Sequence, residues 1–414
     1  MESLALFKTF KERRLFFGIA FLIFLVNIYV HFIEYKKFIK NEVYFTHGTI
    51  VNIYNKKNFS TLKIKTDNFT FFTNSNKNNL ILFQKINLYI ISNNISFISY
   101  LKGFYSKSFN ITFQKNNTTI KQNLYNNINS QHQSYDISSL YSALFIATPL
   151  TPLLREFANN FGISHLIAIS GFHLGIISIV LYFCVHLIYH KFHSIYFPYR
   201  NKRFDILLSV SLLLFCYLIF LDIPASLLRA FTMFLFALFL VRNNIKILSF
   251  ETLFIISILI ISCYPKLLFS LSLWFSITGV FYIFSFLKYF HNLHKYLKLL
   301  FFNFWIYLAI NPITHYFFPI TSLEQLYSPI LSILFTIFYP VSVILHILQM
   351  GGILDSFFMS IINMDIYTIE VYTQDWIFVS YICISLLSII KKSFFLLLNL
   401  FMLIYNIWLF HFIF

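Results

Sequence analysis

A polar run at residues 165–175, with the sequence HLIAISGFHLG, interrupts an otherwise apolar stretch of the chain. Polar side chains are costly in a bilayer, so they usually face the interior of a helix bundle or a path for water. A helix break at Ser170–Gly171 would expose backbone amides, which can hold an anion such as phosphate. We therefore predict a functional crossing point through the membrane, and its candidate residues are His165, Ser170, Gly171, His173 and Gly175.

Two other interpretations of this run are open. Gly171 and Gly175 form a G-x-x-x-G pair, which is typical of close packing between membrane helices. Ser170 and His173 stand three residues apart and could approach each other on one helical turn, as in an intramembrane hydrolase. The rhomboid pattern has glycine two residues before the serine, where this chain has Ala168, and no partner histidine is evident in a later span. We therefore expect no enzymatic activity and assign no catalytic residue.

Arg229 is a second candidate, in the apolar segment that follows Asp222 and Pro224. An arginine in such a segment can extend its side chain to the membrane interface. It can also line a conduit, where a fixed positive charge attracts phosphate. The sequence leaves both possibilities open.

No cofactor or metal site is expected. The four cysteines lie in apolar runs without the spacing of metal ligands, and there is no phosphate-binding G-x-x-x-x-G-K-[ST] loop. These cysteines are Cys184, Cys216, Cys263 and Cys383.

The composition indicates an integral membrane protein. Of the 414 residues, 58% are apolar and 11% are charged, and the mean hydropathy is +0.72. A soluble domain has about 25% charged residues, because its core needs a polar surface around it. This excludes a cytosolic enzyme. The net charge of +16 is partly accounted for by basic loops on the cytoplasmic side.

Ten apolar segments are candidate spans. They cover 15–33, 163–189, 204–221, 225–241, 249–263, 267–287, 299–317, 323–348, 376–390 and 393–413. Pro329 and Pro340 divide the segment 323–348, for which we expect a broken, re-entrant pair.

Residues 41–138 contain no spanning segment, and they carry ten lysines against three acidic residues. Alternating patterns predict strands near 43–54, 59–66, 68–73, 80–92, 95–101 and 109–114. The excess charge is either a solubilising surface or a patch for a polyanion. The candidate residues of such a patch are Lys56, Lys57, Lys63 and Lys65.

Together these patterns predict an all-α polytopic membrane protein of about 8–11 membrane segments, with a small β-rich extracytoplasmic domain that forms a small barrel or sandwich. We expect a cytoplasmic N-terminus and an extracytoplasmic region at 41–138. The expected parts are a cytoplasmic N-terminus at 1–14, an anchor at 15–33, the β domain at 41–120, an amphipathic linker at 121–160 and a channel domain at 161–414.

The run HLIAISGFHLG resembles the H-L-L-A-I-S-G-L-H-V-G motif of the ComEC family of competence proteins. The stretch 224–230 and the segments 263–269 and 271–276 are similar to further motifs of that family. Tyr264 replaces an aspartate of the family pattern, and Leu273 replaces a glutamine. The chain has no H-x-H-x-D-H cluster, so it resembles a short form without the metallo-β-lactamase-like domain.

The resemblance implies an inner-membrane channel that conducts transforming single-stranded DNA into the cytoplasm. It also implies an OB-like fold for the outer β domain, with DNA as the polyanion that Lys56, Lys57, Lys63 and Lys65 would bind. It implies as partners single-stranded DNA, a periplasmic DNA-binding competence protein, and a cytoplasmic helicase or single-strand-binding proteins. Membrane lipid and a second copy of the chain are further expected partners. The alternatives are a transporter of a small molecule or lipid, and an intramembrane hydrolase.

Overall fold

The computed structural model describes residues 9–55, 59–75, 81–113, 120–242 and 249–411. The N-terminal part contains α1 Phe10–Phe38, β1 Val43–Asn55, β2 Ser60–Lys65, β3 Thr70–Ser75, β4 Lys85–Ile91, α2 Phe97–Lys102, β5 Phe104–Tyr105 and β6 Ser108–Phe113. Four helices follow, namely α3 Ile120–Asn129, α4 Tyr135–Ile146, α5 Pro152–Asn160 and α6 Ser164–Ile167.

The remaining part is mostly helical, with two short strands and three 3-10 turns in the described ranges. Its elements are α7 Gly171–Tyr196, α8 Lys202–Phe220, α9 Ala225–Arg242, α10 Phe250–Cys263, η1 Pro265–Phe269, α11 Leu271–Tyr289, α12 Lys295–Phe317, β7 Ile320–Thr321, η2 Leu323–Tyr327, α13 Ser328–Ile347, η3 Gly351–Leu354, α14 Asp355–Ile362, β8 Ile369–Glu370, α15 Asp375–Leu387 and α16 Lys392–His411.

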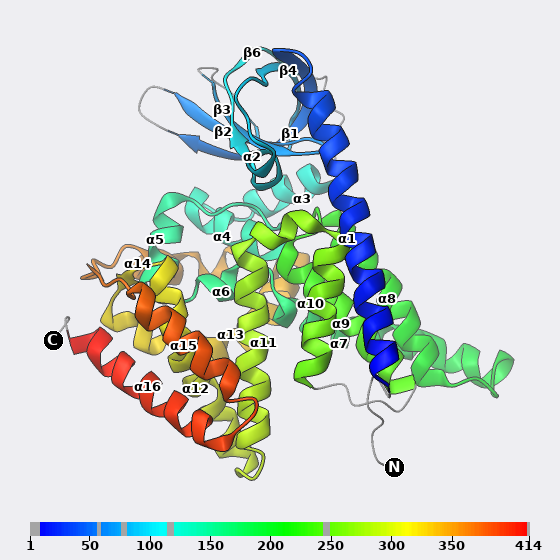
Figure 1. Ribbon diagram of the computed structural model, residues 1–414, viewed down its shortest axis with the longest axis vertical. Helices are drawn as coiled ribbons and strands as arrows, with labels where there is room; N and C mark the ends of the chain where they lie inside the picture. The colour runs from blue at the N-terminus through cyan, green and yellow to red at the C-terminus, as the bar shows by residue number, and fades with distance from the viewer. Residues whose placement is uncertain (1–8, 56–58, 76–80, 114–119, 243–248, 412–414) are drawn as a thin grey trace.

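The expected class of fold, a polytopic helical membrane protein with a small β domain, is confirmed. Among the described residues, seven helices are long and apolar enough to cross a bilayer, and four shorter apolar helices accompany them. The β domain lies at one end of the helical body, joined to it by the long helix α1 (Figure 1).

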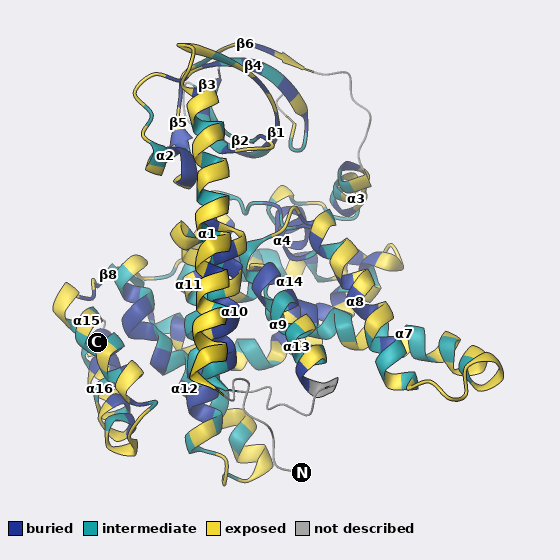
Figure 2. Cartoon of the chain, turned by 45° about the vertical axis from the view of Figure 1, so that its right-hand side comes forward, coloured by how far each residue is buried: buried dark blue, intermediate teal, exposed yellow. Residues whose placement is uncertain are grey.

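The β domain is a six-stranded sheet with the order β5-β3-β2-β1-β4-β6. The long strand β1 pairs with both β2 and β4, and β3 pairs with β5 in parallel. Only two residues separate β5 from β6, which pairs with β4, so the sheet curls back on itself (Figure 2). Alternate residues such as Leu62, Ile64 and Leu88 point inward and are fully buried. The OB-fold itself stays a prediction.

The strand expected over 95–101 is wrong, because this segment forms helix α2. Ser96 caps the helix by accepting a hydrogen bond from the Ser99 amide at 3.2 Å. Tyr100 and Leu101 follow Phe97 by three and four residues and bury their side chains on one face. This is helical rather than strand spacing, and the local cap decides between the two.

The expected re-entrant pair at 323–348 is also wrong. The short turn η2 leads directly into α13, which runs unbroken from Ser328 to Ile347. Pro329 lies in the first turn, where a missing amide proton costs nothing. Pro340 lies inside the helix and removes one hydrogen bond without ending it.

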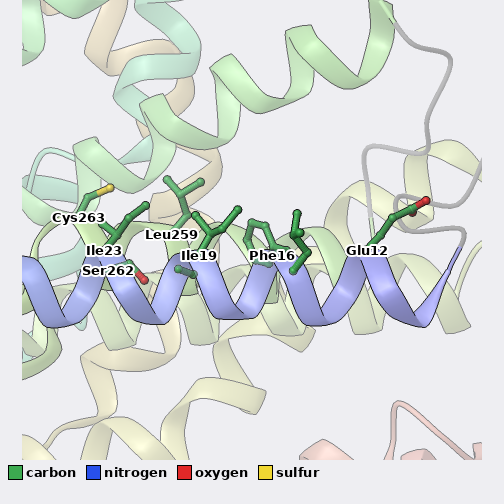
Figure 3. A pocket seen from close by; sticks show the side chains of 9 residues that line it. Glu12, Phe16, Ile19, Ile23, Leu259, Ser262 and Cys263 are labelled. Atoms are coloured by element: carbon green, nitrogen blue, oxygen red, sulfur yellow. The ribbon is translucent and has the colours of Figure 1, made fainter.

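Helix α1 packs along α10 and leaves an apolar groove of about 410 Å³ between them (Figure 3). Asn27 lies within the long apolar helix α1, and its Nδ2 donates to the Ser262 carbonyl of α10 at 2.9 Å. Such a bond satisfies a polar group that lipid cannot satisfy. It therefore joins the anchor to the helical body.

Candidate functional site

The polar run contains the helix break that its sequence predicts. Helix α6 ends at Ile167, residues 168–170 are extended, and α7 begins at Gly171. Ser170 caps α7, because its Oγ accepts a hydrogen bond from the Phe172 amide at 3.3 Å. His173 completes the cap, since its Nδ1 accepts from the Ser170 amide at 3.2 Å. The two polar side chains therefore build the start of α7 together.

His173 is fully buried at this break. Because its Nδ1 accepts a backbone proton, the neutral ring carries its own proton on Nε2. Nε2 has no hydrogen-bond partner among the residues that the structure describes. The ring instead meets Tyr339 of α13 edge to face, with centroids 4.5 Å apart. His173 thus fixes α7 against α13.

Arg229 reaches the same place from α9, and only 6% of its surface is exposed. Its Nε donates to Ser276 Oγ of α11 at 2.6 Å, and its Nη1 lies 3.7 Å from the sulfur of Met233. It forms no ion pair with any acidic residue in the described ranges. The start of α7 therefore faces a buried positive charge that these residues do not neutralise.

The loop before α9 sets this approach. Asp222 and Ile223 both have left-handed backbone conformations, with φ of 64° and 57°. Such residues cost free energy and persist only where contacts hold them. Here Asp222 pairs with Lys121 at 2.6 Å and with Lys65 at 3.7 Å, and Ser226 Oγ donates to the Ile169 carbonyl at 2.7 Å. The loop thus ties α9 to the outer domain, to α3 and to the helix break.

A pocket of about 280 Å³ opens beside the break. It lies between the end of α4, the extended residues 168–169, the start of α9 and the start of α11. Thr148, Ser164, Ser226 and Ser272 contribute its polar side chains. Thr148 Oγ1 is buried without a hydrogen-bond partner in the described part of the chain. Such a group is suited to a polar ligand or water.

The structure separates the candidate residues of the run. Ser170, Gly171 and His173 lie together, and Arg229 joins them. His165 is exposed on α6. Gly175 has open space where its Cβ would be. The two glycines therefore do not form one packing surface within this chain.

Gly171 and Gly175 give a matched test of this difference. A Cβ on Gly171 would lie 3.1 Å from Ala230 Cβ and 3.5 Å from Arg229 Nη2. We expect Gly171→Val to force α7 and α9 apart, at a cost of about 1–3 kcal/mol, and to impair the activity of the protein. Gly175→Val serves as the control and should leave both stability and activity near wild type. Thermal unfolding of the purified variants measures the first effect, and equal Tm values would contradict the close approach.

The outer-domain lysines have different surroundings. Lys56 and Lys57 lie outside the described residues. Lys63 Nζ lies 5.8 Å from the centre of the Phe72 ring. Lys65 binds Asp222 of the helical body, where its Nζ also donates to the backbone carbonyl at 3.3 Å. Lys65 therefore joins two parts of the protein, a role that sequence patterns do not reveal.

A buried polar chain, Asp355–His132–His346, was not predicted. His132 Nδ1 lies 2.8 Å from Asp355 Oδ1, and its Nε2 lies 3.0 Å from Nε2 of His346. His346 Nδ1 lies 2.7 Å from the Ser342 carbonyl. The His132 side chain is fully buried and stacks on Tyr141 at 4.7 Å. More than 200 residues separate His132 from its partners, so no local pattern signals the cluster.

Each side chain of this cluster has a partner at hydrogen-bond distance within the described residues, and the Gln133 amide also donates to Asp355 Oδ2 at 3.2 Å. We call this cluster the Asp355–His132–His346 clasp. It fastens the α3–α4 loop to the end of α13 and the start of α14.

The fold and the site define a multi-pass membrane protein whose broken helix faces a buried arginine. The family model for competence proteins matches residues 149–412, well over half of the chain. The chain belongs to this family, which indicates a role in DNA uptake during competence. No curated protein matches the chain. No solved structure matches it either.

Proposed function

We propose that this protein forms the inner-membrane channel that conducts transforming single-stranded DNA into the cytoplasm. The observation that carries the proposal is Arg229, a buried cation without an acidic partner in the described ranges, beside the start of α7. A helix N-terminus also favours negative charge. Phosphate groups that pass one after another need such a site, because a bilayer offers them no compensation.

The membrane potential opposes this movement. Moving a phosphate into a cytoplasm whose potential is −100 mV costs about 2.3 kcal/mol of free energy per full charge. A passive pore is therefore insufficient, and we propose that a cytoplasmic helicase or single-strand-binding proteins pull the strand. A periplasmic DNA-binding competence protein would deliver it. The lysine-rich outer domain, at the extracytoplasmic side, would receive it.

Two variants of Ser170 test the anion path. Asparagine and aspartate cap helices equally well, so both should preserve the start of α7. Ser170→Asp would place a carboxylate beside Gly171, which lies close to Arg229, and repel phosphate. We expect Ser170→Asn to retain uptake of labelled DNA in a deletion strain, whereas Ser170→Asp should lose most of it.

The same pair separates the rival functions. A hydrolase with Ser170 as nucleophile would be inactivated by both substitutions. A transporter of neutral molecules would tolerate both. Normal DNA uptake in the deletion strain would refute the channel directly. Membrane abundance of each variant, measured in parallel, excludes loss by misfolding.

A further inference from the structure

The outward face of the β domain carries a ladder of aromatic rings. Phe45 of β1 stands opposite Tyr89 of β4, and Tyr89 stands opposite Phe109 of β6. The first two ring centroids are 5.1 Å apart, and the second pair is stacked at 5.7 Å with an interplanar angle of 12°. We call these three residues the aromatic ladder.

The ladder is exposed although its rings are large and apolar. Phe45 is 53% exposed and Phe109 is 45% exposed. The neighbouring residues Leu88 and Ile90 point inward and are fully buried, so they fill the core without the ladder. In Figures 1 and 2, strands β4 and β6 pass over the top of the domain, on the side away from the main body of helices.

Positive charge flanks the ladder on the same face. Lys85 stands opposite Thr49, two pleats from the Phe45–Tyr89 pair. Lys107 adjoins Ile91, whose amide donates to the Lys107 carbonyl at 3.2 Å. Both lysines are exposed, and neither forms an ion pair with a residue that the structure describes. Lys65 lies on the same outward face, because it also stands opposite Thr49, and its side chain binds the helical body.

We propose that the aromatic ladder is a stacking surface for the unpaired bases of single-stranded DNA, with Lys85 and Lys107 contacting its phosphates. Aromatic rings accept any base, because every base has a π-face, and lysines follow the backbone. The bases of a DNA duplex are already stacked on their neighbours, so we expect the aromatic ladder to bind single-stranded DNA in preference to a duplex. The choice of DNA as the ligand rests on the proposed function, whereas the surface itself does not.

The test uses the full-length protein in nanodiscs and a fluorescent oligo-dT of about 20 nucleotides, long enough to fill one site of ~4–16 nucleotides. We expect the double variant Phe45→Ser/Phe109→Ser to bind at least about tenfold more weakly. Tyr105 of β5 is 52% exposed and lies outside the ladder, so Tyr105→Ser is the matched control and should bind like wild type. Phe45→Trp/Phe109→Trp should restore the affinity and excludes a folding defect.

An abasic oligonucleotide separates stacking from charge. It should bind wild type and the serine variant equally weakly, since it offers phosphates without bases. Lys85→Gln/Lys107→Gln should instead reduce the salt dependence of binding. Unchanged oligo-dT binding by the serine variant would overturn the proposal, as would an abasic strand that binds as tightly as oligo-dT. Reduced self-association without reduced DNA binding would also overturn it, because the ladder would then contact a second copy of the chain.

The two proposals fail separately. If the ladder variants bind DNA normally while Ser170→Asp still blocks uptake, the proposed channel is supported and the proposed role of the ladder is refuted. If Ser170→Asp has no effect while the ladder variants lose binding, the DNA-binding surface is supported and the anion path is refuted.

Discussion

Arg229→Met will strongly reduce DNA uptake while the protein still folds and reaches the membrane. The methionine removes a buried charge that no acid in the described ranges balances, so the free energy of unfolding should stay equal or rise. A hydrogen bond to a charged group is worth about 1.5–3 kcal/mol, so each passing phosphate loses that contact and uptake should fall by roughly 10- to 100-fold. The measurement is labelled DNA recovered from the cytoplasm of complemented deletion cells.

Arg155→Met is the matched control for this result. Arg155 is exposed on α5, outside the helix break, and its loss should leave uptake unchanged. Arg229→Lys keeps the positive charge but loses the planar guanidinium group, which can donate two parallel hydrogen bonds to a phosphate. We therefore expect intermediate uptake. If Arg229→Met takes up DNA at the wild-type rate, the arginine serves packing alone and the proposed anion path is refuted.

His132→Ala will destabilise the protein more than any exposed substitution. It removes the centre of the Asp355–His132–His346 clasp and leaves the carboxyl group of Asp355 and the imidazole of His346 without their shared hydrogen-bond partner. Breaking a buried pair in this way costs about 3–5 kcal/mol. The empty volume beside Tyr141 adds to that cost. We expect the Tm of the purified protein to fall by roughly 5 °C or more.

A double-mutant cycle identifies the clasp as the cause. His132→Ala and Asp355→Ala should be strongly non-additive, because they remove the same interaction. Asp365→Ala, at an exposed carboxylate just after the end of α14, should change stability by less than about 0.5 kcal/mol. Additive effects of the first two substitutions would show that the residues act independently.

Local patterns were sufficient for the membrane class and for the break in the polar run. The chain has few charged residues and many apolar segments, so its apolar surface must contact lipid however the helices pack against one another. Ser170 and His173 stand at N-cap and N3 spacing, so the cap depends on neighbours in the chain. The same locality explains one error. The segment 95–101 contains β-formers, but Ser96 caps a helix whose buried face decides the outcome.

The prediction of a helix break at 323–348 was wrong because the free-energy cost of a proline depends on its position in the helix. Pro329 falls in a first turn, where no amide bond is lost, and packing tolerates Pro340 farther along. The alternative that both glycines serve close packing holds for one of the two. Only Gly171 meets a neighbouring helix, and which face of α7 meets α9 is a tertiary property.

The sequence by itself determined that the protein lies in a membrane, that a polar β-rich region precedes an apolar helical region, and where the polar run lies. These features follow from composition and short-range spacing. Only the tertiary structure decided which charges are balanced. It placed Lys65 on Asp222, joined His132 to Asp355 across the chain, and left Arg229 buried without an acid in the described ranges. A charge is compensated by what lies a few ångströms away in space, and neighbours in space are not neighbours in the chain.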